Sequence, residues 1–161
     1  MPDAGVPGDL KERLSVPEVS PPFTDLADAA QGLGHVAKSL ERGMEDRSHP
    51  LFVFHKGSFL PSFPLRLAMA HLGVQPRQAV VEESHLQVRD IAIPHGQGEM
   101  LVDFSLPPEA VPRFSFGDLL QGGKIPPALK GKAVLIGLDL EGDRALVTPA
   151  GSRITRTEFF A

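Results

Sequence analysis

The stretch LFVFHKGSFLPSFPLRLAMAHLG, residues 51–73, places a strand pattern directly before a helix pattern. Its first part has two runs rich in Phe, Leu and Val around Lys56-Gly57, which is the spacing of a two-residue hairpin turn. Ser62 then stands at the cap position of a helix that Gly73 ends. The stretch therefore predicts a β-hairpin followed by a helix, and a fold that combines the two kinds of element.

Two shorter helices and several strands are predicted around this stretch. Thr24 can cap a helix that Gly32 and Gly34 end, and Ser115 can cap another that ends at Gly122-Gly123. Strand patterns occupy residues 34–37, 79–82, 86–94 and 100–104, the last two joined by a turn over 95–98.

A further strand is predicted from the run KAVLIG at residues 132–137, in which 133–136 are all apolar and lie between Gly131 and Gly137. Such a run is typical of a strand that is buried on both faces. The predicted fold class is α/β (mixed α+β), with a partly incomplete mixed sheet, three short helices and a buried strand near 133–137.

Composition limits the classes of function. The 161 residues fit one domain, with residues 1–22 predicted as a Pro-rich disordered tail or linker and 23–161 as the folded part. The net charge is -4 and no basic block occurs, which argues against a nucleic-acid partner. Cysteine is absent, so disulfides, thiolate nucleophiles and zinc–thiolate sites are excluded. Without a signal peptide or a membrane span in this sequence, a free-standing chain would be soluble or cytoplasmic.

Sequence motifs for catalysis are absent. The chain contains no nucleophile elbow, no phosphate-binding loop motif and no zinc-binding helix motif. Its six histidines lie at no metal-ligand spacing and are interpreted as surface or half-buried residues. We therefore expect a protein that is not an enzyme, with no catalytic residue, no cofactor and no metal. A small hydrolase that uses a carboxylate after the last strand is a less favoured alternative.

The order of short segments along the chain resembles the type 2 CHASE domain, a sensory module of bacterial receptors. The segments are, in order, Gly34-His35-Val36, Asp46-Arg47, 60–68, Leu72-Gly73-Val74, Ile93-Pro94, 100–104, 114–120, 129–137, Gly142-Asp143-Arg144 and 148–152. The resemblance runs from about residue 23 to 161 and leaves out the segments that open the family domain. It therefore implies the C-terminal part of such a domain.

This resemblance implies a non-catalytic, extracytoplasmic signal-input domain that binds an unknown small-molecule signal. The implied partner is a membrane-linked output domain, a cyclase or a histidine or Ser/Thr kinase. Because an incomplete sheet has uncovered edges, a homodimer or pairing with the missing half-domain is also expected. The alternative is a remnant half-domain that acts as a protein-interaction module and binds no signal.

Candidate ligand-binding residues follow the predicted buried strand. The carboxyl ends of strands in α/β proteins face the ligand crevice, which favours the polar residues after residue 137. With two further candidates from the resembling segments, the set is Asp139, Asp143, Arg144, Thr148, His35 and Asp103.

Overall fold

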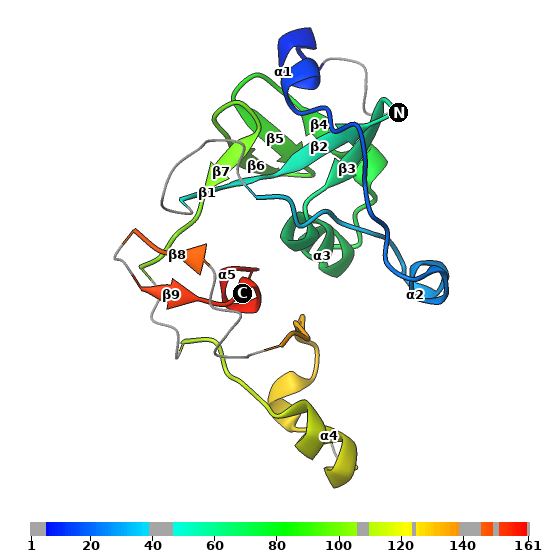
Figure 1. Cartoon of the computed structure of the whole chain (residues 1–161), viewed down its shortest axis with the longest axis vertical. Coiled ribbons are helices and arrows are strands. Elements are labelled where there is room, and N and C mark those ends of the chain that lie inside the picture. The colour runs from blue at the N-terminus through cyan, green and yellow to red at the C-terminus, as the bar shows by residue number, and fades with distance from the viewer. Residues whose placement is uncertain are drawn as a thin grey trace. The chain divides into compact units, whose positions relative to one another are not determined.

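A computed structural model describes residues 6–38, 47–105, 110–123, 125–138, 146–149 and 152–160. The chain divides into two compact units, an N-terminal unit (Met1–Val102) and a C-terminal unit (Asp103–Ala161). The described elements are short helices and small antiparallel sheets (Figure 1), so the predicted mixed α/β class is confirmed.

The predicted hairpin is present in the N-terminal unit. Strands β2 (Phe52–His55) and β3 (Ser58–Pro61) pair antiparallel. Lys56 and Gly57 have φ values of 50° and 77°, and positive φ at both turn positions matches the right-handed twist of the strands that they join. Three phenylalanine rings interlock on this hairpin, with centroid distances from 5.3 to 6.2 Å, and belong to Phe52, Phe54 and Phe59.

The predicted helix follows as α3 (Phe63–His71). The Ser62 hydroxyl oxygen accepts the Leu65 N–H at 3.4 Å, which satisfies one of the free amides at the helix start. Gly73, with φ 68°, allows the chain to leave the helix. The short helix η1 (Pro76–Gln78) then leads into the next sheet.

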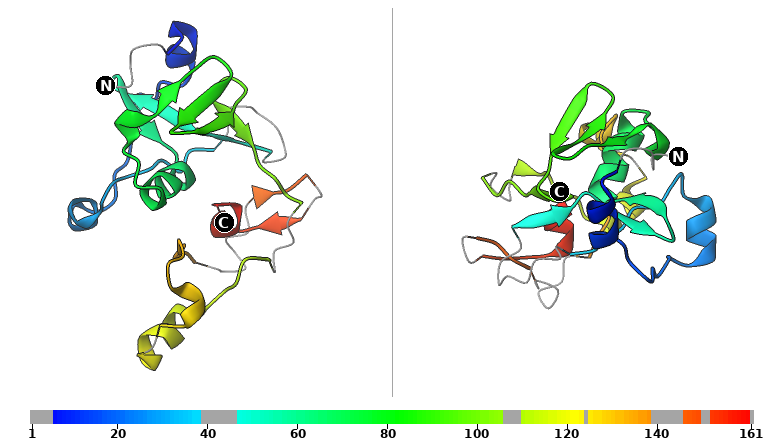
Figure 2. Two further views of the ribbon diagram at one scale, coloured as in Figure 1. Left: turned by 180° about the vertical axis from the view of Figure 1, so that it is seen from behind. Right: turned by 90° about the horizontal axis from the view of Figure 1, so that it is seen from above.

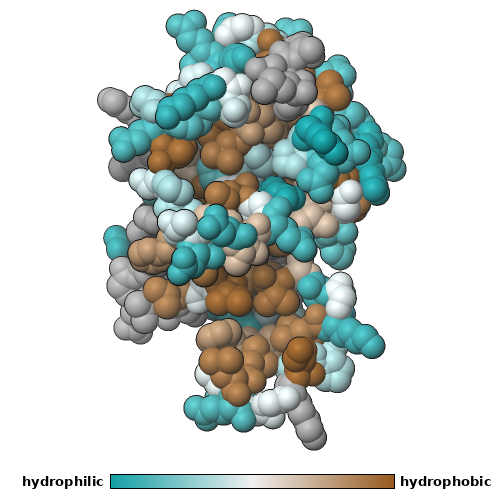
Figure 3. Space-filling model, turned by 90° about the vertical axis from the view of Figure 1, so that its right-hand side faces the viewer, coloured by the Kyte–Doolittle hydropathy of each residue, from teal (hydrophilic) through white to brown (hydrophobic). Residues whose placement is uncertain are grey.

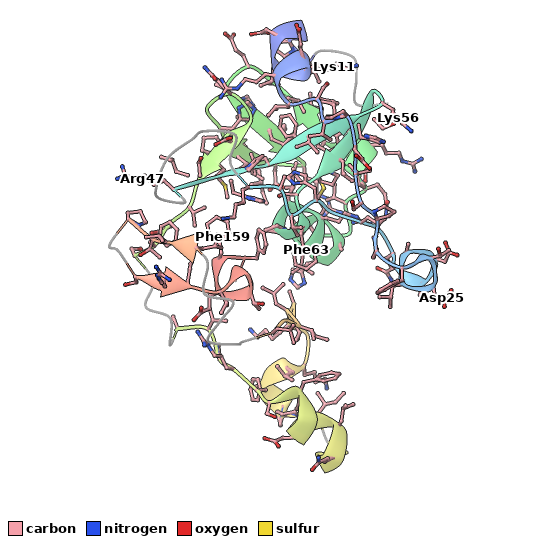
Figure 4. All side chains as sticks on the ribbon, in the orientation of Figure 1. Lys11, Asp25, Arg47, Lys56, Phe63 and Phe159 are labelled. Atoms are coloured by element: carbon pink, nitrogen blue, oxygen red, sulfur yellow. The ribbon has the colours of Figure 1, made fainter. Side chains whose placement is uncertain are left out.

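An N-terminal helix contributes to the same core, which differs from the expectation of a disordered tail over residues 1–22. Helix α1 (Gly8–Arg13) buries Leu10, and Leu14 follows it in the core. The Phe54 N–H donates to the Leu14 carbonyl at 2.9 Å, so this segment pairs with the free edge of β2. Lys11, labelled in Figure 4, places its ammonium 5.6 Å from the Phe54 ring centroid. Two buried leucines and an edge pairing are enough to order a Pro-rich segment that lacks a longer apolar pattern.

The core of the N-terminal unit lies between α1, α3 and the strands. In Figures 1 and 2, α1 and α3 lie on opposite sides of the β2–β3 hairpin. The buried apolar side chains of this cluster are Leu10, Leu14, Leu51, Phe52, Phe54, Leu65, Met69, Val74, Ala79, Val81, Leu86 and Val88.

The strand predicted over 86–94 is wrong in detail, because it is two strands. β4 (Val80–Val81), β5 (His85–Val88) and β6 (Ile91–Pro94) form an antiparallel meander. Arg89 has φ 55° and turns the chain between β5 and β6. The turn lies at Arg89-Asp90, where neither Gly nor Pro marks it in the sequence.

The last strand of the N-terminal unit pairs with a strand that was not predicted from the sequence. β7 (Glu99–Leu101) follows the predicted turn over 95–98 but pairs with β1 (Ser48–Pro50), antiparallel, with His49 opposite Met100. Only one bridge, Gly96 to Glu99, closes the turn itself. The N–H of Leu51, between β1 and β2, donates to the Gly98 carbonyl at 2.9 Å, which ties the two sheets together.

The predicted helix near residue 24 and the strand over 34–37 are both shorter than expected. Helix α2 (Thr24–Ala29) has Phe23, not Thr24, at its N-cap and buries no side chain. The predicted strand is a single parallel bridge between His35 and Ser62. Gly34 explains the close approach, because a Cβ atom there would lie 2.6 Å from the Phe63 Cα.

In the C-terminal unit, the predicted cap of the third helix is confirmed. The Ser115 hydroxyl oxygen accepts the Asp118 N–H at 3.3 Å at the start of α4 (Phe116–Gly122). Gly123 ends the helix with φ 60°, and the short helix η3 (Pro127–Leu129) follows. Further on, β8 (Leu146–Val147) pairs with β9 (Arg153–Ile154), and α5 (Arg156–Phe160) closes the unit.

The predicted buried strand near 133–137 is wrong. Residues 132–138 have no regular secondary structure, and the side chain of Ile136 is 75% exposed. The segment lies against α5, where a Cβ on Gly137 would overlap the Thr157 side chain. An extended apolar run becomes a strand only when a neighbouring backbone offers hydrogen bonds, and no strand in the described ranges pairs with it.

Candidate functional site

The predicted ligand residues are divided between the two units and the undescribed segments. Asp139, Asp143 and Arg144 lie outside the described residues, so their role stays a prediction. Thr148 and Asp103 lie in the C-terminal unit and His35 in the N-terminal unit.

Thr148 has a local structural contact. Its residue is 6% exposed, and its hydroxyl oxygen accepts the Ser152 N–H at 3.2 Å. The Thr148 N–H in turn donates to the Ser152 carbonyl at 2.9 Å, just beyond the β8–β9 pair. The side chain therefore helps to close the connection between these strands.

Asp103 is exposed and bonds within its own loop. Its Oδ1 atom accepts the Ser105 N–H at 2.8 Å. Hydrogen bonds from the Ser105 hydroxyl and amide lower the pKa of Asp103, because they stabilise the carboxylate. This pattern is an Asx turn, which orders the loop after the N-terminal unit.

His35 lies in the tightest part of the N-terminal unit. Its N–H donates to the Pro61 carbonyl at 3.0 Å, and its carbonyl accepts the Phe63 N–H at 2.8 Å, so the backbone is fastened beside the start of α3. The imidazole Nδ1 accepts the Ala37 N–H at 3.2 Å. Because an amide N–H can only donate, this nitrogen carries the lone pair, and the proton of the neutral ring is on Nε2. The Nε2 atom is enclosed and has no hydrogen-bond partner among the described residues.

His49 lies beside His35, on β1. The two ring centroids are 5.8 Å apart, with the rings tilted by 34°. His49 is 3% exposed and faces Glu99 of β7, which is 7% exposed. The Ser48 hydroxyl donates to the Glu99 carboxylate across the β1–β7 pair. Two imidazoles, a carboxylate and a hydroxyl therefore meet where β1 pairs with β7; we call this group the histidine cluster.

His95 repeats the arrangement of His35 in the turn before β7. Its Nδ1 accepts the Gly98 N–H at 3.2 Å, and its Nε2 is enclosed without a hydrogen-bond partner in the described ranges. Its ring meets Phe52 edge to face, 5.8 Å between centroids. The turn is therefore packed against the hairpin core through an imidazole.

Burial keeps these imidazoles neutral. It lowers the pKa of His35 to about 4, with the proximity of His49 as a second cause. Burial also lowers the pKa of His49 to about 4, against an opposing effect of the Glu99 carboxylate. The pKa of His95 is lowered by burial too. These imidazoles can take up protons only at a pH well below the usual pKa of histidine, or if the structure around them opens to water.

Sequence reasoning named His35 but missed His49, His95 and Glu99. His49 directly precedes the hairpin run, and Glu99 follows a turn, yet no local pattern shows that their strands pair. Among the described residues, no group of three or more His, Asp or Glu side chains is arranged to hold a metal ion.

The C-terminal unit offers an apolar groove. It encloses about 460 Å³ and is lined by Leu119, Leu120, Gly123, Ile125, Leu129 and Val134. Brown, apolar side chains gather over the α4 region in Figure 3. The described lining residues of this groove are all apolar or glycine.

Comparison with known proteins identifies the family. No curated protein and no solved structure gives a significant match to the chain. None of the helices in the described ranges has the length and apolar content that crossing a membrane requires. Residues 7–161 match the CHASE2 domain family. Because the match covers nearly the whole sequence, the chain belongs to the CHASE2 domain family, a family of non-catalytic sensory domains.

Proposed function

We propose that this chain is the extracytoplasmic signal-input domain of a bacterial receptor and regulates a cyclase or a histidine or Ser/Thr kinase. The observation that carries the proposal is the family match over residues 7–161. Output domains of these kinds are associated with CHASE2 domains. The receptor would place the output domain on the other side of the membrane from this chain.

A sensory domain acts by shifting between conformations of different output. A signal can shift such an equilibrium only by binding one conformation better than the other. The N-terminal unit has a well-buried core. A change inside this core therefore alters a defined conformation of the unit. Output should therefore respond to the state of this unit.

For a small polar signal, we propose contacts with Asp139, Asp143 and Arg144, which precede β8 in sequence, and with Thr148, which follows it. These residues include charges of both signs close together in sequence, which suits a signal with polar or ionic groups. Asp143→Ala and Arg144→Ala should each weaken the response to such a signal. An unchanged response in both variants would show that these residues are not the site.

The experiment that tests the sensory function joins the whole chain, through a membrane helix, to an adenylate cyclase catalytic domain. Met69→Ala removes a fully buried side chain from the N-terminal core, whereas Leu26→Ala trims a side chain that is 62% exposed. We expect Met69→Ala to change basal cyclic AMP production and Leu26→Ala to leave it unchanged. Equal output from the parent and both variants, at equal protein levels, would contradict a sensory role.

A second candidate function is protein interaction through the C-terminal unit. Large apolar side chains are exposed there, among them Ile125 at 80% and Leu120 at 69%. Exposed apolar groups that gather on one surface are typical of interaction sites. Sedimentation of the chain should show a species heavier than the monomer, and Leu120→Glu should return it to the monomer.

A further inference from the structure

The histidines of the chain are unevenly buried. His35, His49 and His95 hold enclosed Nε2 atoms, while His71 on α3 is exposed. Three buried imidazoles lie within one unit, and two of them are in ring contact at 5.8 Å. Burying three polar, titratable rings costs free energy, which suggests that they have a role other than packing.

In the closed structure, the hydrogen bonds of His35 and His95 leave neither ring with a nitrogen ready to take up a proton. In His35 and His95 the Nδ1 lone pair is already used by a backbone N–H, at 3.2 Å in both. A proton on Nδ1 would turn this acceptor into a donor that faces another donor. It would also leave a cation where the ring has been removed from water.

Neighbouring charges do not remove this conflict. His35 faces His49 from β1, so a proton on either ring repels a proton on the other. The guanidinium of Arg66, on α3, is directed to the Gln31 carbonyl, with Nη2 at 2.7 Å. Glu99 on β7 is the carboxylate that attracts a proton to His49, and it already accepts the Ser48 hydroxyl.

His95 has similar surroundings. His85 of β5 faces it and opposes its protonation, while the Glu82 carbonyl favours it. The carboxylate of Glu82 lies 3.9 Å from His85 Nε2, where it can pair with the protonated form of that ring instead. Of the two carboxylates, Glu99 faces His49 and Glu82 lies beside His85.

The three rings also fasten the same part of the fold. The His35 backbone joins the start of α3, His49 lies in the β1–β7 pair, and His95 packs the turn before β7 on Phe52. Opening the β1–β7 pair and this turn would expose all three imidazoles to water together.

We propose that this unit is an acid sensor: protons captured by His35, His49 and His95 open the β1–β7 pair and the segments fastened to it. The inference rests on the proposed sensory function and names its signal as the hydronium ion. In the open form the lone pair of each neutral ring accepts a proton, and water solvates the imidazolium cations. Because more than one proton enters per opening, the change is steeper with pH than the titration of one group.

The test uses the full chain and follows each histidine by its Cε1–H NMR signal from pH 7.5 to 4. The exposed His71 provides the reference signal within the same unit. The signals of His35, His49 and His95 should hold their neutral shifts until a joint transition at lower pH. Amide signals of β1 and β7 should be lost in that same transition.

Matched variants link the transition to the cluster. His35→Asn supplies an oxygen that still accepts the Ala37 N–H but does not titrate, and His49→Gln removes the second ring. The double variant should move the transition down by about half a pH unit or more, because two fewer protons drive it. His71→Gln, at an exposed position of the same unit, should leave the transition in place.

Three results would overturn the acid sensor. The first is a double variant whose transition has the same midpoint pH as that of the parent. The second is titration of the His35 and His49 signals at about pH 6.5 without loss of the β1 and β7 amide signals. The third is the absence of any transition down to pH 4. The parent chain alone provides the second and third tests if the double variant does not fold. None of these results bears on the Met69→Ala cyclase experiment, so the sensory function and its signal fail separately.

Discussion

The two units of this chain differ in how they hide their apolar side chains. In the N-terminal unit, a hairpin, two helices and a meander enclose a cluster of leucines, valines and phenylalanines. Among the described residues of the C-terminal unit, Leu146 is the one large apolar side chain that is buried, while Ile136 and Phe116 are largely exposed. Both units have apolar runs and capped helices, so composition does not explain the contrast.

This difference in burial arises from how many elements pack against one another in each unit. Elements of the N-terminal unit are long enough, and near enough in sequence, to bury each other's faces, as β2, β3 and α3 do within residues 52–71. In the C-terminal unit the described strands have two residues each. A core requires several partners at once, and single elements with good local patterns do not make one.

The largest effect is expected from truncation of the N-terminal core. Phe52→Ala should lower the free energy of unfolding of that unit by about 3–5 kcal/mol, because it removes a fully buried ring that contacts Phe54, Phe59 and His95. The measurement is urea denaturation followed by the NMR amide signals of β2 and β3.

Its control is Ile136→Ala in the C-terminal unit. This side chain is 75% exposed, and its truncation should change stability by less than about 0.5 kcal/mol. A loss as large as that of Phe52→Ala would mean that Ile136 is buried in solution and that the contrast between the units does not hold.

A smaller effect is expected where the backbone is closest to α3. Gly34→Ala should destabilise the N-terminal unit by about 1–3 kcal/mol, because the new Cβ would lie 2.6 Å from the Phe63 Cα and backbone atoms cannot move aside cheaply. Gly8→Ala is the matched substitution, since nothing lies within 4 Å of a Cβ there. Thermal unfolding should separate the two, and equal melting temperatures would show that the His35–Ser62 bridge is not formed.

The two serine caps compare the units directly. Ser62 and Ser115 accept an N–H three residues ahead at 3.4 and 3.3 Å, but Ser62 is buried at the centre of the unit and Ser115 is exposed. Ser62→Ala should cost about 1–2 kcal/mol and Ser115→Ala about 0.5–1 kcal/mol, since a buried amide left without a partner cannot turn to water. Hydrogen exchange at Leu65 and Asp118 measures both. A larger loss of stability in Ser115→Ala than in Ser62→Ala would contradict the conclusion that the N-terminal unit is the better packed one.

The sequence predicted those elements whose signals are local. Lys56-Gly57 fixes the hairpin turn, and Ser62 and Ser115 fix helix starts, because turn and cap chemistry depends on neighbours within four residues. The burial of Leu10 and Leu14 was not predicted, because it depends on the edge of β2 more than thirty residues away. The pairing of β1 with β7 is equally distant in sequence.

The candidate site shows the same limit. Of its members His35 was predicted, but its partner His49 was not, because their rings meet through a strand pairing with no local signature. The run at 132–137 shows the converse error, since apolar content alone predicted a buried strand where the segment is exposed. Local chemistry thus predicts elements, whereas burial depends on which distant segments meet.

The smallest effect is expected from low pH on the stability of the C-terminal unit. The two units should lose stability at different pH values. All six histidines precede residue 96, so this unit has none. Its Glu158 accepts the Thr155 N–H and an Arg113 N–H, each at 2.6 Å, and the Thr155 bond is the main cause that lowers the pKa of Glu158 below 4.5. The unfolded chain therefore binds this proton more readily, and stability is present above pH 4.5 and falls as the pH drops through the folded pKa.

The N-terminal unit should lose stability earlier. The pKa of His35 and His49 is lowered from 6.5 to about 4, so the unfolded chain gains protons between these values and stability falls across that window. Because its partner Arg113 is 48% exposed, the contribution of Glu158 is a few tenths of a kcal/mol, about that of a surface ion pair. Amide protection in α5 should stay constant from pH 7 to 5, while amide protection in β1 declines. Glu158→Gln should remove the pH dependence of amide protection in α5 below pH 4.5. If protection of α5 and β1 declined together, the two units would unfold as one, and the division that underlies the comparison would be wrong.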